Sequence, residues 1–99
     1  MDEPEPDPLV LPIEDSLDLH AFAPRDVLSV VDEYLRAAAA RGLREVRVIH
    51  GRGKGVQRAA VQSMLRAHPV AESFFDAPEG RGGWGATVVL LRPGPVSEP

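Results

Sequence analysis

The sequence predicts an α/β two-layer sandwich with the element order strand, helix, strand, helix, strand, strand. Two short segments, 16–20 and 45–50, alternate apolar and polar residues as half-buried strands do. Each is followed by a segment whose apolar residues recur at helical spacing. Two further strands, 70–77 and 86–91, flank a glycine-rich loop. With 99 residues and an apolar fraction of 43%, the chain can form one small domain with a modest core.

The first helix is expected to follow a loop over 21–24, because Pro24 fits the first turn of a helix. Gly42 is placed to end this helix in the left-handed conformation, and Leu43 to pack back onto it. The helix presents an apolar stripe to the sheet, formed by Val27, Val31, Tyr34, Leu35 and Ala38.

The second strand, 45–50, directs Val46 and Val48 to one face and Arg47 and Ile49 to the other. The second helix is expected to start near Val56 and to end before the step His68-Pro69. Its apolar stripe comprises Val56, Ala60, Val61, Met64 and Leu65.

The topology follows from the connections. The first two run through helices, so we expect the strands that they join to pair in parallel by right-handed crossovers. The last two strands should form an antiparallel hairpin closed by residues 78–85. The result is a four-stranded mixed sheet with both helices on one face. We expect this domain to span 16–92, with an acidic, proline-rich flexible arm over 1–15 and a disordered tail over 93–99.

Composition narrows the class of protein. The absence of cysteine excludes disulfides and thiolate metal sites. No apolar stretch approaches the ~20 residues that span a bilayer, and the acidic start lacks the features of a secretory signal. We therefore expect a cytoplasmic protein that has no membrane partner.

The net charge of −4 conceals a strong asymmetry. Residues 1–18 carry seven acids and no base, whereas residues 41–66 carry seven bases and one acid, Glu45. One interpretation is a basic surface for phosphates, which the acidic arm could cover. The alternative is a solvated helix face beside an acidic tail. The bases are Arg41, Arg44, Arg47, Arg52, Lys54, Arg58 and Arg66.

Asp18 and His20 form the first candidate site. Their spacing of two on a strand, opposite Leu17 and Leu19, would place both side chains on one face. A carboxylate beside an imidazole can orient it for proton transfer. The alternative is an ordinary pair on the polar face of an exposed strand.

The segment from His50 to Gly55 forms the second candidate site. Its glycines, Gly51, Gly53 and Gly55, let the backbone turn sharply, and the following helix offers free N–H groups and a positive dipole end. Arg52 and Lys54 add charge, so the turn could hold a phosphate. Its spacing matches neither a P-loop nor a dinucleotide fingerprint. The alternative is a tight connection that needs flexible backbone.

The third candidate site is the segment Gly82-Gly83-Trp84-Gly85, preceded by Arg81. Trp84 could stack on a base and Arg81 could contact a phosphate. The alternative is a tryptophan that plugs the edge of the sheet. His68, by contrast, is expected only to help end a helix, and the three histidines show no zinc-ligand spacing.

These three segments together resemble a known family. Leu17-Asp18-Leu19-His20 resembles the LDxH motif of Smr (small MutS-related) domains, and His50-Gly51-Arg52-Gly53 resembles their HGxG motif. The segment 82–85 and the valine-rich strand after it resemble their closing glycine segment. The resemblance covers roughly residues 16–92. The sequence departs from it after His20, where Ala21 stands in place of the glycine of many members.

The resemblance implies a fold similar to the C-terminal domain of translation initiation factor three, and an endonuclease or nicking activity on DNA or RNA. By resemblance, Asp18 and His20 belong to the catalytic motif, and the turn after His50 binds the nucleic-acid backbone and shares in catalysis. The implied partner is nucleic acid, with the ribosome or a repair protein as further candidates.

The leading hypothesis is a phosphodiesterase in which residues 51–55 and Arg58 hold phosphates. His20, oriented by Asp18, takes a proton, and His50 protonates the leaving oxygen or supports the transition-state charge. RNA can be attacked by its own 2′-hydroxyl, whereas DNA cleavage would favour a divalent ion, Mg²⁺ or Mn²⁺, near Asp18. The alternatives are a non-catalytic nucleic-acid-binding module, and an interaction domain that uses the acidic arm on a basic partner.

Overall fold

We describe the structure from a computed structural model, which covers residues 14–51, 53 and 55–93. The expectations for Arg52, Lys54, most of the arm and the end of the tail lie outside the described residues. The strands are β1 (Ser16–Asp18), β2 (Glu45–Ile49), β3 (Ala71–Asp76) and β4 (Ala86–Leu91). The helices are α1 (Val27–Ala40) and α2 (Val56–Arg66), with short 3₁₀ turns at Leu19–Ala21, Pro24–Asp26, Glu79–Arg81 and Gly83–Gly85.

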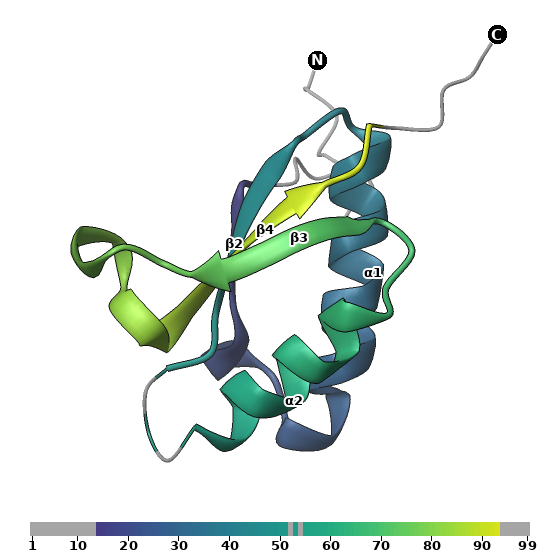
Figure 1. Ribbon diagram of the computed structural model, residues 1–99. Helices are drawn as coiled ribbons and strands as arrows, with labels where there is room; N and C mark the ends of the chain where they lie inside the picture. The colour runs from purple at the N-terminus through teal and green to yellow at the C-terminus, as the bar shows by residue number, and fades with distance from the viewer. Residues whose placement is uncertain (1–13, 52, 54, 94–99) are drawn as a thin grey trace, which may run out of the picture.

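The predicted sandwich is confirmed. The four strands form one mixed sheet, and α1 and α2 pack on the same face of it (Figure 1). The strand order is β1-β2-β4-β3. β1 pairs with β2 in parallel, and β3 pairs with β4 antiparallel, as expected.

One pairing expectation was wrong, because β2 and β3 are not neighbours. β4 lies between them and pairs antiparallel with both. The physical reason is size: a helix is about 10 Å wide, whereas neighbouring strands are about 4.8 Å apart. The crossover through α2 therefore reaches past one strand position, and the hairpin returns β4 into the vacant place.

The core lies between the helices and the inner face of the sheet. The predicted stripe of α1 is buried throughout, and Gly42 ends the helix with φ +87°. On α2 the prediction holds for Val61 and Leu65, and Met64 packs against the core, but Ala60 is exposed and Val56 is 71% exposed. Val56 lines a surface cavity together with Gly51, Gly53 and Gly55, and it is not part of the core.

The outer face of the sheet carries a smaller apolar cluster. Ala77, Ala86 and Val88 are buried there, with Ile49 and Leu90 packed against them. We call this side the open face, because neither helix covers it. In the described part of the chain, no helix is both long and apolar enough to cross a bilayer.

Candidate functional site

Asp18 and His20 meet as predicted, but through a different local structure. β1 ends at Asp18, and residues Leu19–Ala21 form a 3₁₀ turn that Asp18 caps. Asp18 Oδ1 accepts the backbone N–H of His20 at 2.9 Å and lies 2.7 Å from His20 Nδ1. Leu19 is 1% exposed and anchors the turn in the core.

These contacts define the chemistry of the pair. The backbone N–H and then the ring of His20 stabilise the carboxylate, so they lower the pKa of Asp18. Because a carboxylate only accepts, Nδ1 of His20 carries the proton in this hydrogen bond. The lone pair of a neutral His20 therefore sits on Nε2, which is the arrangement that a general base requires.

His20 lies directly against the second motif. β1 and β2 are parallel, so their carboxyl ends meet at the same edge of the sheet. Gly51 follows β2 with φ +84°, and a Cβ atom there would lie 3.0 Å from His20 Nε2. The structure thus requires glycine at position 51 for its backbone angle and for the imidazole beside it.

His20 and His50 line one cavity, which confirms the expectation that the two motifs converge. The cavity has a volume of about 240 Å³, and we call it the His20 cavity. It is lined by His20, His50, Gly51, Gly53, Gly55, Val56 and Gln57.

His50 also lines this cavity, but unlike His20 it is buried and both of its ring nitrogens make hydrogen bonds within the protein. Its residue is 6% exposed, Nδ1 lies 3.0 Å from the Gly51 carbonyl, and Nε2 lies 2.8 Å from Thr87 Oγ1. A carbonyl only accepts, so Nδ1 donates and Nε2 accepts the Thr87 hydroxyl proton. Burial lowers the pKa of His50, which favours this neutral form. Both ring nitrogens are thus engaged inside the protein, contrary to the free proton donor that the sequence suggested.

The first turn of α2 supplies the third side of the cavity. Gly55 caps the helix with φ +79° and makes no side-chain capping bond. The first N–H groups of a helix have no intrahelical partner and carry the positive end of its dipole. The cavity therefore combines a candidate base with a backbone surface suited to an anion.

The loop that carries Trp84 (residues 82–85, the tryptophan loop) is joined to the turn that follows His50. The Gly85 carbonyl accepts the N–H groups of His50, at 3.1 Å, and Gly51, at 2.8 Å. A Cβ atom at Gly55 would lie 3.6 Å from the ring of Trp84. Trp84 is 40% exposed, which fits both a plug at the edge of the sheet and a partly accessible stacking surface.

A chain of polar contacts links the tryptophan loop to His50. The guanidinium of Arg58 lies 5.6 Å from the centre of the Trp84 ring and donates twice to Asp76, at 3.0 and 2.8 Å. This pairing lowers the pKa of Asp76. Gln62 Nε2 lies 3.1 Å from Asp76 Oδ1 and 3.0 Å from Thr87 Oγ1, which in turn bonds His50.

Sequence reasoning missed Asp76, Gln62 and Thr87, although one signal was present. Thr87 is the one polar residue in the strand Ala86–Leu91, and it is fully buried. A buried hydroxyl requires a hydrogen-bond partner, which pointed to a polar neighbour across the sheet. The partners themselves come from other elements, so spacing along the chain could not identify them.

The structure does not bring Arg81 to the cavity. Arg81 lies over the open face, where its Nη1 is 3.6 Å from Glu45 and its carbonyl accepts Arg47 Nη1 at 2.8 Å. Gly82 and Gly83, with φ +116° and +54°, shape the loop that carries it there.

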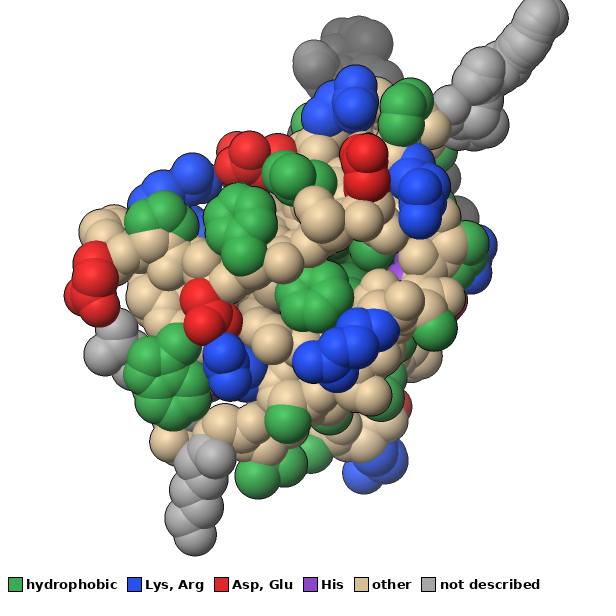
Figure 2. Space-filling model, in the orientation of Figure 1, with side chains coloured by type: hydrophobic (Ala, Val, Ile, Leu, Met, Phe, Trp, Pro, Cys, Tyr) green, Lys and Arg blue, Asp and Glu red, His purple; other side chains and the backbone are tan. Residues whose placement is uncertain are grey.

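The described bases of residues 41–66, which leave out Arg52 and Lys54, are spread over separate parts of the fold. Arg41 and Arg44 lie at the start of β2, whereas the glycine turn follows its end. Arg58 is paired with Asp76. On the face shown in Figure 2, basic, acidic and apolar side chains alternate. The expectation of a continuous basic surface is therefore not met in the described residues.

Comparison with known proteins gives the family. The Smr domain family matches residues 17–92. The chain is 46% identical over 77 residues to endonuclease MutS2 of Thermus thermophilus, covering 78% of this chain and 10% of that protein. It is 43% identical over 77 residues to endonuclease MutS2 of Caldicellulosiruptor saccharolyticus, again covering 78% and 10%. The chain thus spans about a tenth of the curated relatives that it matches.

Two solved structures share the fold. The Smr domain of Thermus thermophilus MutS2 superposes with a TM-score of 0.76 at 44% identity, over 81% of this chain and all of that one. YdaL, a stand-alone small MutS-related protein from Escherichia coli, gives a TM-score of 0.74 at 30% identity, over 82% of this chain and 66% of that one. On the match over residues 17–92 and these likenesses, the chain belongs to the Smr domain family.

Proposed function

We propose that this chain binds nucleic acid and cleaves a single strand at the His20 cavity. The observation that carries the proposal is the position of His20 Nε2. Asp18 holds the opposite ring nitrogen, and Nε2 faces the Gly51 backbone in a cavity that also contains the first turn of α2. A candidate base and a backbone suited to an anion thus meet within one cavity.

RNA is the substrate that this arrangement fits best. A phosphate held at the first turn of α2 would present its neighbouring 2′-hydroxyl to His20. Nε2 takes the hydroxyl proton, the 2′-oxygen forms a bond to phosphorus, and the bond from phosphorus to the 5′-oxygen breaks. The departing oxygen takes a proton from water at the open cavity mouth, and the hydroxide left behind takes the proton from His20, which restores the neutral base. The products are a 2′,3′-cyclic phosphate and a 5′-hydroxyl.

His50 acts as a positioning residue in this scheme. Its ring bonds the Gly51 carbonyl and Thr87, and its N–H bonds Gly85. These contacts fix the turn against which His20 lies. A turn fixed in advance needs no reorganisation when charge develops on the phosphate.

DNA lacks the 2′-hydroxyl, so water would have to attack, and an Mg²⁺ or Mn²⁺ ion near Asp18 would assist it. The donors present do not fit such an ion. Asp18 already accepts two hydrogen bonds from His20, and no group of three or more His, Asp or Glu side chains gathers in the described residues.

The relatives support nucleic acid as the ligand class, because the MutS2 proteins are named endonucleases. The matched segment is about a tenth of those proteins, so their activity is a proposal for this chain. A ribosome or a repair protein as a further partner stays a prediction.

The test is a cleavage assay on labelled single-stranded RNA, single-stranded DNA and duplex DNA, with and without EDTA. We expect EDTA-insensitive cleavage of RNA to cyclic-phosphate ends. His20→Ala should reduce the rate by about 10²- to 10⁴-fold, the usual contribution of a general base. Asp26→Asn removes an exposed acid from the start of α1 and serves as the control. Wild-type rates in His20→Ala would refute the assignment.

A binding module without catalysis is the second candidate. The internal engagement of both His50 nitrogens favours it, because one of the two expected catalytic histidines lacks a free nitrogen. This candidate predicts salt-sensitive binding, no product, and unchanged binding in His20→Ala. The same assay, with binding measured in parallel, distinguishes the two.

A further inference from the structure

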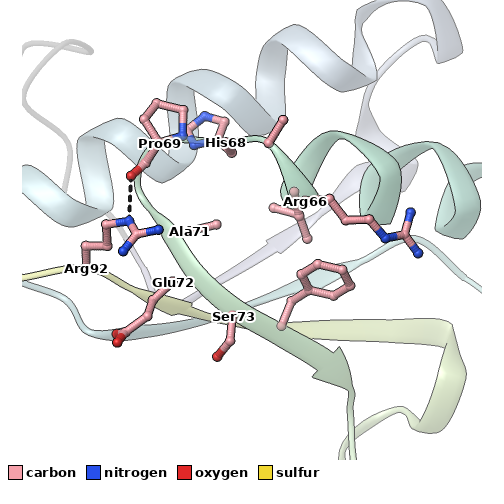
Figure 3. A pocket seen from close by; sticks show the side chains of 10 residues that line it. Arg66, His68, Pro69, Ala71, Glu72, Ser73 and Arg92 are labelled. Carbon is pink, nitrogen blue, oxygen red and sulfur yellow. Dashed lines mark hydrogen bonds between the residues drawn. The ribbon is translucent and has the colours of Figure 1, made fainter.

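A second and larger cavity lies at the opposite end of α2 from His20. Its volume is about 470 Å³, and it opens between the last turn of α2, the start of β3 and Arg92 (Figure 3). We call it the α2–β3 cavity. The chemistry of the candidate site leaves it unused.

Its walls combine two guanidinium groups with an aromatic ring. The Arg66 guanidinium lies 5.8 Å from the centre of the Phe74 ring, which is partly buried. Arg92 is held in place because its Nε donates to the Pro69 carbonyl at 2.9 Å. Figure 3 shows Arg66 and Arg92 on opposite sides of the cavity.

The charges favour a base inside the cavity and phosphates at its rims. The carbonyl end of α2 faces this cavity and carries the negative end of the helix dipole. Glu72 also lines the cavity, so a phosphate within it would be repelled. A nucleobase suits these acceptors because its amino groups can donate to the Glu72 carboxylate.

The α2 helix connects the two cavities. Its first turn lines the His20 cavity and its last turn lines the α2–β3 cavity. Its 11 residues separate the two by about 16 Å, at about 1.5 Å of rise per residue. The pair of Arg58 and Trp84 lies near the first turn of α2, and the pair of Arg66 and Phe74 lies at its last turn. An arginine–aromatic pair thus stands at each end of the helix. Single-strand-binding proteins use this combination of cations and stacking surfaces.

We propose that the α2–β3 cavity binds a base of the same single strand whose phosphodiester enters the His20 cavity, with Arg66 and Arg92 on the flanking phosphates. This inference rests on the proposed function. It makes the substrate single-stranded, because a base can enter the cavity only when it is unpaired.

The test measures binding of the full chain to fluorescent RNA strands of about 4 and about 12 nucleotides, within the usual range of single-strand sites. The variant Arg66→Gln with Arg92→Gln removes both rim charges. The control, Arg25→Gln with Arg41→Gln, removes the same charge from exposed positions outside both cavities. For the longer strand, the test variant should bind about fivefold or more weakly, while the control matches the wild type.

Salt dependence provides a second readout. Each phosphate contact to a single strand contributes a slope of about −0.7 in log K against log salt, so losing two should flatten the slope by about 1.4. Equal losses in the test and control variants, or an equal loss on duplex DNA, would overturn the inference. His20-dependent cleavage of the short strand reports the proposed function separately, so the two can fail independently.

Discussion

Replacing Gly51 by alanine tests the contact on which the proposed chemistry depends. Two effects are expected from one methyl group. The backbone has φ +84°, where a residue with a Cβ atom costs about 1–2 kcal/mol. The methyl carbon would also lie 3.0 Å from His20 Nε2, closer than a normal contact, so the imidazole must shift by a few tenths of an ångström.

The two effects can be separated with matched glycines. Gly42 has φ +87° and Gly53 has φ +38°, and a Cβ atom at either would have no heavy atom within 4 Å. Gly42→Ala therefore reproduces the backbone strain at a distant helix end, and Gly53→Ala places a methyl group in the same turn as Gly51. Neither substitution displaces His20.

All three variants should lose about 1–2 kcal/mol of unfolding free energy, or roughly 4–16 °C in Tm for a domain of this size. Compared with Gly42→Ala, Gly51→Ala should also lose about tenfold in single-turnover cleavage rate, because displacements near 1 Å can cost about 10². The assays are thermal unfolding by circular dichroism and cleavage well below each Tm. If Gly51→Ala cuts as fast as Gly42→Ala, His20 does not act against this turn.

Three further predictions concern the residues around His50. Thr87→Val, which keeps the shape but removes the hydroxyl, should cost about 1–3 kcal/mol by chemical denaturation, because His50 Nε2 and Gln62 lose their shared partner; an unchanged midpoint would contradict the polar chain. Trp84→Ala should weaken single-strand binding by about 1–3 kcal/mol in a fluorescence titration, with less effect on duplex; equal losses on both would indicate a structural role. Burial lowers the pKa of His50, so on acidification from about pH 7 the unfolded chain takes up a proton first and stability falls, a fall that His50→Gln should reduce; equal pH dependence in the two proteins would refute it.

Much of the fold could be predicted from local patterns in the sequence. The stripe of α1 and the left-handed end at Gly42 follow from residue spacing and from the freedom of glycine, which act within one element. The position of β4 between β2 and β3 does not, because it depends on how far a helical crossover reaches across the sheet. Strand order depends on how several elements pack together, and no residue in β4 determines it alone.

His68 shows the same limit for single residues. Its place before Pro69 predicted a helix terminator, and α2 does end at Arg66. The structure also buries it at 7% exposure, with Nε2 2.7 Å from Asp32 of α1. The contact lowers the pKa of Asp32 and ties the two helices together. Sequence reasoning missed this because the partner lies 36 positions away on another element.

In the candidate site, too, local pattern predicted some features, whereas contacts between elements determine the others. The motifs around His20 and His50 were placed together correctly, because parallel neighbouring strands end at one edge of a sheet. Their roles were not equivalent, since the burial of His50 depends on Thr87 and Gln62 from other elements. Exposure and hydrogen-bond engagement therefore separate a histidine that can move a proton from one that holds a turn. In this domain the exposed His20 meets the first condition, and the buried His50 meets the second.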